Sequence, residues 1–337
     1  MSRLIKTKVY AGRLKDRAEL IQSSSGGAFT AISDYFLENG NAICATVYDY
    51  NTDRPVFRLL NTFEGRNDAR GSKYIQSSPG DIFKEAYEWV KNNPDKKLMF
   101  IGTGCQADGF RIYSEMKGIR DRVFIVDLIC HGTSSPKLWR EYIREVEKEY
   151  GPVEYITFKD KRNGWQNPTA VAVTDKHEVL MNDYVNIFYN RCALRPSCHR
   201  CPYATTERQT DMTIGDFWHI ENTIPDFFDP DGTSLFLIHT KEGKLLFDQI
   251  KENLNYRESN TKECEQDNLA RPTPVSPNRK KFWNDYRKHG INYIMKKYGQ
   301  LSYTQRAINK LKRIAPKLNR GGHTLTNSAE SLLLEAA

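Results

Sequence analysis

Long apolar runs are missing from this chain of 337 residues. The longest ones, at residues 98–101 and 123–126, are far shorter than the roughly 20 apolar residues that a membrane-spanning helix needs. The first residues are basic, but no apolar stretch of signal-peptide length follows them. We therefore expect no transmembrane segment and no secretion, and we predict a cytoplasmic protein.

Cysteine is also scarce. The chain has seven cysteines, an odd number that does not suit a disulfide framework. A reducing compartment and thiolates bound to a metal fit this number better. Cys44 and Cys264 stand alone in the sequence, and we interpret both as buried structural thiols. The other five cysteines remain as candidates for metal-binding chemistry.

Acidic residues are nearly absent from residues 279–320, which hold thirteen Lys or Arg and one acid, Asp285. This segment has a charge of +12 and the whole chain has +8, so the remainder has −4. We find no nucleic-acid-binding motif in the basic segment and expect no nucleic-acid partner. The segment is predicted to form two basic helices, which either dock an acidic partner or an anionic surface or are simply solvated.

Two turns rich in small residues precede regular elements. Residues 23–27 open a helix, since Phe29, Ile32 and Phe36 recur at helical spacing. Such a loop is either a cradle for a phosphate, with backbone N–H groups pointing outward, or an ordinary helix start. The second turn, residues 71–77, contains Lys73, which can meet a phosphate as a point charge.

Strand and helix patterns alternate in the middle of the chain. Strands are predicted at 97–102 and 122–129, each followed by a helix, which implies a parallel sheet with right-handed crossovers. Cys105 and Cys130 follow the carboxyl ends of these strands, where such sheets bind ligands. We therefore predict an α/β fold. It has a mixed, largely parallel sheet with flanking helices, a cysteine-rich loop and a basic helical C-terminal tail.

The cysteine-rich loop contains Cys192, Cys198 and Cys201. The Cys-x-x-Cys spacing of the last two lets both thiolates reach one metal centre from a tight turn. The spacing alone leaves two candidates open, an iron–sulfur cluster and a structural zinc ion.

Six motifs, in order, resemble the beta-subunit family of coenzyme F420 hydrogenases and dehydrogenases. They are residues 24–27 (SSGG), 71–74 (GSKY), 102–106 (GTGCQ), 127–132 (DLICHG), 195–201 (RPSCHRC) and 211–218 (DMTIGDFW). The resemblance implies an oxidoreductase with FAD and a four-iron four-sulfur (4Fe-4S) cluster. It would pass electrons between a deazaflavin or similar hydride carrier and an iron–sulfur partner protein.

The resemblance also implies site residues. We assign the FAD phosphates and their surroundings to Ser24, Ser25, Gly26, Gly27, Gly71, Ser72, Lys73, Tyr74, Gln76, Thr103 and Gln106. The predicted cluster ligands are Cys105, Cys130, Cys198 and Cys201, with Cys192 as the alternative ligand and zinc as the alternative metal. His131 is the predicted catalytic residue, which tunes or protonates the flavin, unless it is an ordinary structural histidine.

Several other polar residues have open roles. Asp211 and Asp216 either bind ribose or order the cysteine loop, or they are solvated or capping carboxylates. Lys161 and Arg162, near Trp165, either receive an anionic substrate or form a charged hairpin tip.

The sequence departs from the family pattern in several places. It lacks the eight-cysteine ferredoxin-like domain that relatives often carry at the N-terminus, which leaves the route by which electrons enter or leave open. His219 stands where the family has Gly, Gly104 where it has Pro, and Thr133–Ser134 where it has Val–Pro. A local change of backbone or ligand is expected there.

We predict a catalytic domain at 1–267, a linker with the basic tail at 268–320, and a segment without fixed structure at 321–337. An alternative function is a non-redox binding module, stabilised by zinc or a cluster, in a surface-polysaccharide biosynthesis complex. A transferase acting on sugars is a third possibility.

Overall fold

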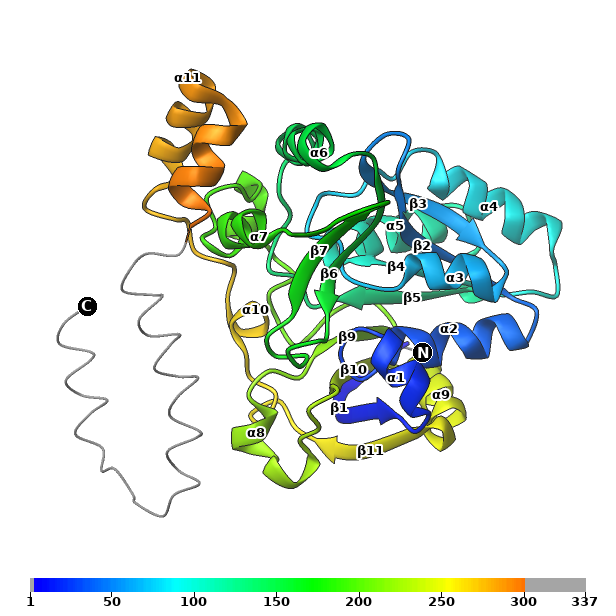
Figure 1. The fold of residues 1–337 in the computed structure, drawn as a ribbon. Coiled ribbons are helices and arrows are strands. Elements are labelled where there is room, and N and C mark those ends of the chain that lie inside the picture. The colour runs from blue at the N-terminus through cyan, green and yellow to red at the C-terminus, as the bar shows by residue number, and fades with distance from the viewer. Residues whose placement is uncertain (1–2, 301–337) are drawn as a thin grey trace, which may run out of the picture.

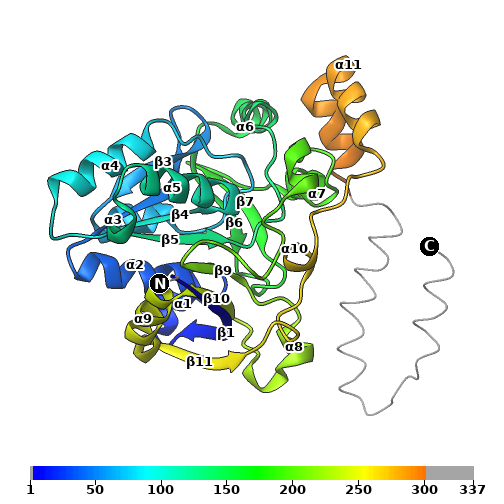
Figure 2. The same cartoon turned by 180° about the vertical axis from the view of Figure 1, so that it is seen from behind.

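The computed structural model of the chain describes residues 3–300 (Figures 1 and 2). The strands are β1 Leu4–Leu14, β2 Ala42–Asp49, β3 Arg54–Leu60, β4 Leu98–Thr103, β5 Val123–Leu128, β6 Val153–Asp160, β7 Thr169–Thr174, β8 Glu178–Leu180, β9 Met212–Asp216, β10 Ser234–Thr240 and β11 Leu254–Ser259. The helices are α1 Arg17–Gln22, α2 Ala28–Glu38, α3 Phe63–Ala69, α4 Ile82–Asn92, α5 Gly104–Met116, α6 Pro136–Tyr150, α7 Asn182–Tyr189, α8 Ile220–Thr223, α9 Lys241–Ile250, α10 Asp267–Ala270 and α11 Arg279–Tyr298.

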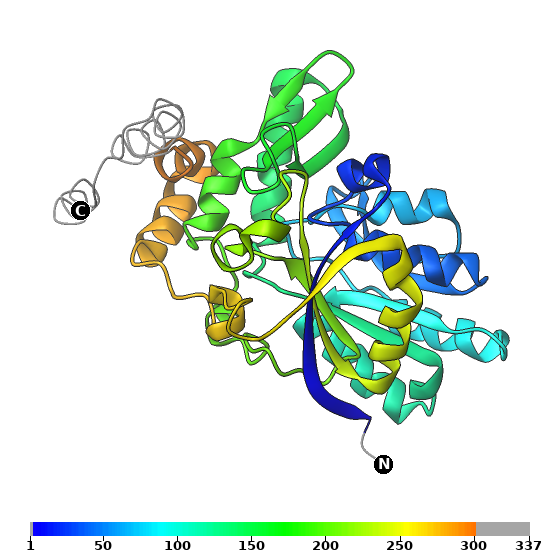
Figure 3. The ribbon, with the colours of Figure 1, turned by 90° about the horizontal axis from the view of Figure 1, so that it is seen from below.

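The main sheet has eight strands in the order β11-β1-β10-β9-β5-β4-β2-β3. Its four central strands, β9, β5, β4 and β2, run parallel, and the outer strands pair antiparallel. β4 and β5 are parallel neighbours, with Thr103 opposite Leu128. Figure 3 shows β1 crossing the underside beside the yellow strand β11. The predicted mixed α/β sheet with flanking helices is therefore confirmed.

Both faces of the sheet are covered, which explains why its central strands are apolar throughout. Alternate side chains, such as Met99 and Ile101 of β4, pack on one face against α2 and α9. The intervening ones, such as Leu98 and Phe100, pack on the other face against α4 and α5. On β1 and β10 that second face is covered instead by Trp165, Phe217 and helices α8 and α10.

A smaller sheet, β6-β7-β8, packs with α6, α7 and α11 around a second core. Figures 1 and 2 show α11 (orange) next to α7. Gly290 has a positive φ of 77° and divides α11 into two helical pieces. The rest of the predicted basic tail, and the segment 321–337, lie outside the described residues.

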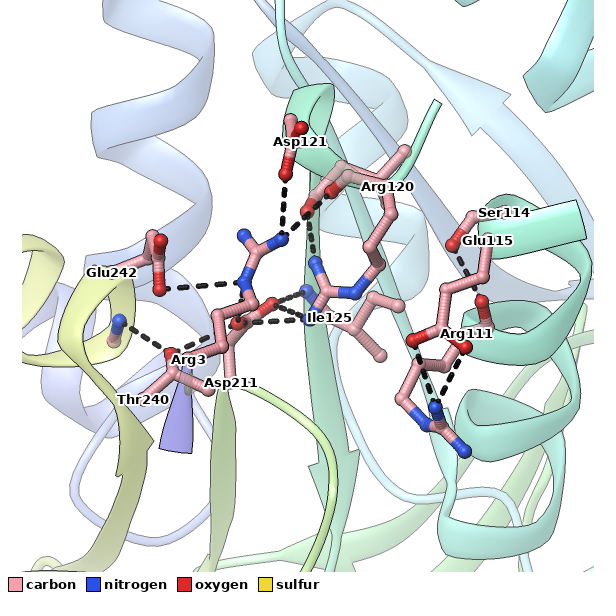
Figure 4. Close-up of polar contacts among 12 residues, drawn as sticks. Arg3, Arg111, Ser114, Glu115, Arg120, Asp121, Ile125, Asp211, Thr240 and Glu242 are labelled. Carbon is pink, nitrogen blue, oxygen red and sulfur yellow. Dashed lines mark hydrogen bonds and ion pairs between the residues drawn. The ribbon is translucent and has the colours of Figure 1, made fainter. Parts of the chain in front are cut away.

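Charged side chains close the amino edge of the parallel strands. Asp211, fully buried at the start of β9, accepts hydrogen bonds from Arg120 Nη2 at 3.0 and 2.9 Å. It also accepts from the Ile125 N–H at 2.8 Å and the Thr240 hydroxyl at 2.9 Å. Figure 4 shows this cluster together with Arg3, whose Nε lies 3.8 Å from the same carboxylate. Asp211 therefore joins β5, β9 and β10 and is not a solvated carboxylate.

Two local sequence patterns differ from the structure. Ser78 followed by Pro79 is typical of a helix start, but Ser78 does not cap α4. Its N–H donates to the Pro55 carbonyl and its own carbonyl accepts from the Phe57 N–H, which joins it to β3, and α4 begins at Ile82. The apolar residues of 241–253 predict one helix over that range, but α9 ends at Ile250 and strand β11 follows shortly after it. β11 is an edge strand in which only Leu254 is buried, so it carries almost no apolar pattern.

Candidate functional site

A cavity of about 430 Å³ opens at the carboxyl edge of the parallel strands. Its wall includes residues from the ends of β4, β5 and β9, and Ser234 at the start of the antiparallel β10. Ligand sites of α/β sheets lie at this edge, and small-molecule sites commonly have volumes of about 300–1,000 Å³. The cavity is therefore the leading candidate for a binding site.

Most residues that the sequence assigned to cofactors line this cavity. They are Ser24, Ser25, Gly71, Ser72, Lys73, Tyr74, Thr103, Gln106, Cys130 and His131. The structure leaves Gly26, Gly27, Gln76, Cys105, Cys198 and Cys201 outside the lining. Segments from four separate parts of the chain thus converge at one place.

The glycines of the first turn pack against the protein. A Cβ on Gly26 would lie 2.3 Å from the Gly12 carbonyl oxygen. Gly27 has a φ of +83°, and a Cβ there would lie 2.4 Å from Leu14 Cδ1. The Ser234 hydroxyl accepts from the Gly26 N–H at 2.9 Å and the Ala28 N–H at 3.3 Å. The N–H groups that were expected to cradle a phosphate are thus partly occupied, and of this turn Ser24 and Ser25 face the cavity.

Lys73 lines the cavity, but its ammonium group is bound to protein. Nζ donates to the carbonyls of Ala69 and Arg70 at 3.0 Å each and to that of Asp68 at 3.4 Å, all at the end of α3. A cation is favoured at a helix C-terminus. Burial nevertheless lowers the pKa of Lys73 to about 7. The amine would have to leave these carbonyls to reach a phosphate.

Thr103 and Gln106 fix the start of α5 beneath the cavity. Gln106 Oε1 accepts from the Thr103 hydroxyl at 2.9 Å and from its N–H at 3.3 Å. Gln106 Nε2 donates to the Ser77 hydroxyl at 2.9 Å, which ties α5 to the second small-residue turn. The pair therefore shapes the cavity floor through its own contacts.

Four of the cysteines lie near one another. Burial first, and then the nearby Cys198, Cys105 and Cys201, raise the pKa of Cys130 to about 12. Burial also raises the pKa of Cys201, with Cys105 and Cys198 again as neighbours. Cys105 is exposed at the start of α5, with Sγ 3.3 Å from the Thr103 hydroxyl. Even so, residues 3–300 contain no group of three or more His, Cys, Asp or Glu side chains already arranged to hold a metal ion.

Cys192 lies apart from these four. It is buried in the second core, and its Sγ is 3.3 Å from the Ser276 hydroxyl. Its carbonyl accepts from Arg279 Nη1 at 2.8 Å. These contacts explain its burial and give it a structural role between the cysteine loop and α11.

His131 is half-buried beside the cavity, and its buried Nε2 has no hydrogen-bond partner among the described residues. Burial first, and then the charge of Arg191, lowers its pKa to about 4, so the ring is neutral at pH 7. Its carbonyl accepts from the Thr273 hydroxyl at 2.6 Å, and the Thr273 carbonyl lies 2.9 Å from His199 Nδ1. The segment predicted to be a linker thus braces the cysteine loop.

The sequence analysis missed an aromatic wall. Tyr74 and Phe188 stack with ring centroids 4.5 Å apart, and Tyr189 meets Tyr74 edge-on at 5.8 Å. His131 lies 5.3 Å from Phe188. Residues 184–189, which directly precede the cysteine loop, form most of helix α7. Apolar residues at helical spacing, including Tyr184, Ile187 and Phe188, were the available signal.

A second missed feature is an ion pair in the cavity wall. Lys159 of β6 bonds to Asp216 at the end of β9, and its Nζ lies 5.8 Å from the Trp218 ring. Asp216 and Asp211 are both paired with cations. Asp216 lies at the cavity, whereas Asp211 lies at the opposite edge of the parallel strands. Arg162 pairs with Asp160 and Glu178 outside the cavity, which fits the charged hairpin tip.

The fold and site together define an α/β protein with a cavity at the carboxyl edge of its parallel strands. Two family descriptions match the chain, and both are of the coenzyme F420 hydrogenase/dehydrogenase beta subunit. The description of its N-terminal part matches residues 9–81, and that of its C-terminal part matches residues 95–263. The chain therefore belongs to the coenzyme F420 hydrogenase/dehydrogenase beta-subunit family, a family of oxidoreductase subunits.

One solved structure with a similar fold is a chain of the F420-reducing [NiFe] hydrogenase complex from Methanosarcina barkeri, in a xenon-derivatised crystal. The two chains are 19% identical with a TM-score of 0.52, and the match covers 88% of this chain and 92% of that one. No curated protein matches the chain. Among residues 3–300, none of the helices has the length and apolar character to span a membrane.

Proposed function

We propose that this protein is an oxidoreductase that uses FAD and a 4Fe-4S cluster to pass electrons between a reduced deazaflavin, or a similar hydride carrier, and a protein partner. Family membership supports the general redox role. The observation that carries the finer proposal is the cavity in which the aromatic wall and the unpartnered His131 Nε2 meet the cysteine region.

The residues of the cavity suit a flavin. Tyr74, Phe188 and Tyr189 offer ring contacts to a planar heteroaromatic ligand. A buried imidazole nitrogen without a partner is costly unless a ligand or water bonds to it. When bound, FAD supplies hydride acceptance and single-electron transfer, and the protein supplies position and electronic environment. We assign His131 the role of contacting the flavin edge, as a neutral ring that donates or accepts one hydrogen bond.

The cysteine thiols have the chemistry that an iron–sulfur cluster needs, but among the described residues they are not already arranged around a common metal centre. Cys105, Cys130, Cys198 and Cys201 are the four thiols that are mutual neighbours, and a 4Fe-4S cluster takes four thiolates. The raised pKa values of Cys130 and Cys201 mean that these thiols ionise only when a metal compensates the charge. We therefore expect the cysteine loop to tighten when the cluster is loaded. If the same four thiolates were found to bind zinc, that outcome would favour the non-redox binding module.

The test is anaerobic purification followed by a visible spectrum and an iron assay. Flavin bands and a brown chromophore are expected. Cys130→Ser and Cys198→Ser should each abolish the iron signal, whereas Cys192→Ser should keep it, because Cys192 faces Ser276. A colourless protein with one zinc, or loss of iron in Cys192→Ser but not in Cys130→Ser, would overturn the proposal.

The proposed partner is an electron-transfer protein steered by the basic tail. A deletion that starts at residue 279 cannot test this, because it removes Phe282, Ile294 and Met295 of α11 from the second core. Deleting residues 301–337 spares that core and removes basic residues only beyond α11. Cofactor content should persist, while reduction of an acidic partner slows and loses its salt dependence.

A further inference from the structure

Lys161 lies in the loop between β6 and β7 and points away from solvent into the main domain. Its Nζ donates to three backbone carbonyls: Leu20 at 2.7 Å, Ser25 at 2.7 Å and Asp231 at 2.6 Å. An ammonium group has three N–H donors, and here each has its own acceptor. This is a complete set of bonds for a half-buried cation, so Lys161 is not free to receive an anionic substrate.

The three carbonyls belong to two segments that are far apart in sequence. Leu20 and Ser25 belong to the first segment, which contributes Ser24 and Ser25 to the cavity wall. Asp231 belongs to the second segment, between β9 and β10. The two segments touch, since a Cβ on Gly232 would lie 2.0 Å from the Ser25 carbonyl oxygen. Lys161 therefore joins the smaller sheet to the edge of the cavity.

Trp165 anchors the same loop a short distance away. Its side chain is buried, and its Nε1 donates to the Asp229 carbonyl at 2.8 Å. Lys159, in β6 just before the loop, lines the cavity. The loop is thus attached on both sides of Lys161. The Lys161 bonds hold the Ser24–Ser25 turn together with two bonds of the turn itself, from Ser25 Oγ to the Thr233 carbonyl at 2.7 Å and from the Gly26 N–H to the Ser234 hydroxyl at 2.9 Å.

We propose that Lys161 is a positioning residue that latches the Ser24–Ser25 turn against the cavity, so that retention of the bound cofactor depends on this ammonium group. The inference rests on the proposed function only in naming the cofactor as FAD. The latch itself is a property of this chain's own contacts.

Three carboxylates surround the ammonium group. Burial lowers the pKa of Lys161 to about 8, opposed mainly by the carboxylate of Asp231. The other charged groups that face it are Asp216 on β9, Asp229 in the β9–β10 loop and Lys159 on β6.

The experiment compares Lys161→Met with Arg162→Met, a neighbour that bonds to Asp160 and Glu178 and not to the turn. Flavin release is followed by the rise of free-flavin fluorescence after dilution of the anaerobic holoenzyme. We expect release about tenfold faster in Lys161→Met and within about twofold of the native rate in Arg162→Met.

Hydrogen exchange of the backbone gives a readout that does not need flavin. Residues 20–27 should exchange faster in Lys161→Met than in Arg162→Met, with or without cofactor. If the native protein binds no flavin but this difference is present, the proposed function fails and the latch stands. If the two variants match in both exchange and flavin release, the latch is wrong even in a functioning flavoprotein.

Discussion

Buried polar groups lie at both edges of the parallel strands β5 and β9, and their hydrogen bonding differs between the two edges. At the amino edge, Asp211 is bonded to Arg120, Ile125 and Thr240, so its buried charge is fully matched by the protein. At the carboxyl edge, His131 Nε2 has no partner within the described part of the chain and faces a cavity. The same strands thus end in a closed structural network on one side and an incomplete polar site on the other.

This difference separates residues that stabilise the fold from residues kept for a ligand. Buried polar groups without partners are rare in folded proteins because each costs free energy. Asp211 and Asp216 looked equivalent in the sequence, since both lie in the same short motif. The structure assigns the first to stability and puts the second in the cavity wall.

The largest effect is expected at the amino edge. Asp211→Ala leaves the Arg120 guanidinium buried without its carboxylate, which should lower the free energy of unfolding by about 3–5 kcal/mol. Urea unfolding of the purified protein measures this. Asp121→Ala is the control, because that exposed carboxylate pairs with Arg3 at the surface and its loss should cost less than about 1 kcal/mol. Equal losses in the two variants would remove the distinction drawn for this edge.

Substitution of Gly27 and of Gly71, one in each small-residue turn, should also have unequal effects on stability. Gly27→Ala combines a φ of +83° with a Cβ 2.4 Å from Leu14, and should cost about 3 kcal/mol. Gly71→Ala has nearly the same φ, +82°, but no atom within 4 Å, and should cost about 1 kcal/mol. Thermal unfolding of the two variants distinguishes the cost of the packing clash from the cost of backbone strain. A Gly71 variant as unstable as the Gly27 variant would contradict the packing argument.

A buried histidine on the structural side should make stability depend on pH. Burial, followed by the charge of Arg208, lowers the pKa of His239 to about 3, and its ring nitrogens meet Thr7 at 3.1 Å and Thr213 at 2.8 Å. Below pH 6.5 the unfolded chain binds a proton that the folded chain does not. Stability is therefore lost as the pH falls.

Between pH 6.5 and 5 this loss should be about 2 kcal/mol. In His239→Gln, the loss of unfolding free energy between pH 6.5 and 5 should be smaller by that amount. Urea unfolding at several pH values measures it. An unchanged loss would show that the imidazole is not held neutral.

The smallest predicted effect concerns the aromatic wall. Tyr189→Ala should weaken flavin binding about three- to tenfold, the amount expected from one lost ring contact. Tyr155→Ala is the matched control, because Tyr155 is 56% exposed, compared with 45% for Tyr189, and does not line the cavity. Titration of both variants with FAD checks the difference, and equal affinities would argue against a flavin beside α7.

The sequence was sufficient to predict the centre of the fold and to single out several residues that line the cavity. Buried parallel strands are continuous apolar runs, so β4 and β5 were found, and Cys105 and Cys130 were placed after the ends of neighbouring strands. What escaped prediction depends on contacts distant in sequence. Lys161 became a latch only because the carbonyls of Leu20 and Asp231 come together, and no local pattern encodes that contact.

Hydrogen exchange with and without FAD tests the central claim most directly, because it reads both edges of the sheet in one experiment. The account predicts that FAD protects residues 71–77 and 128–134 around the cavity and leaves residues 120–125, beside Asp211, unchanged. Protection at the amino edge, or no change at the carboxyl edge in a protein that binds FAD, would contradict it.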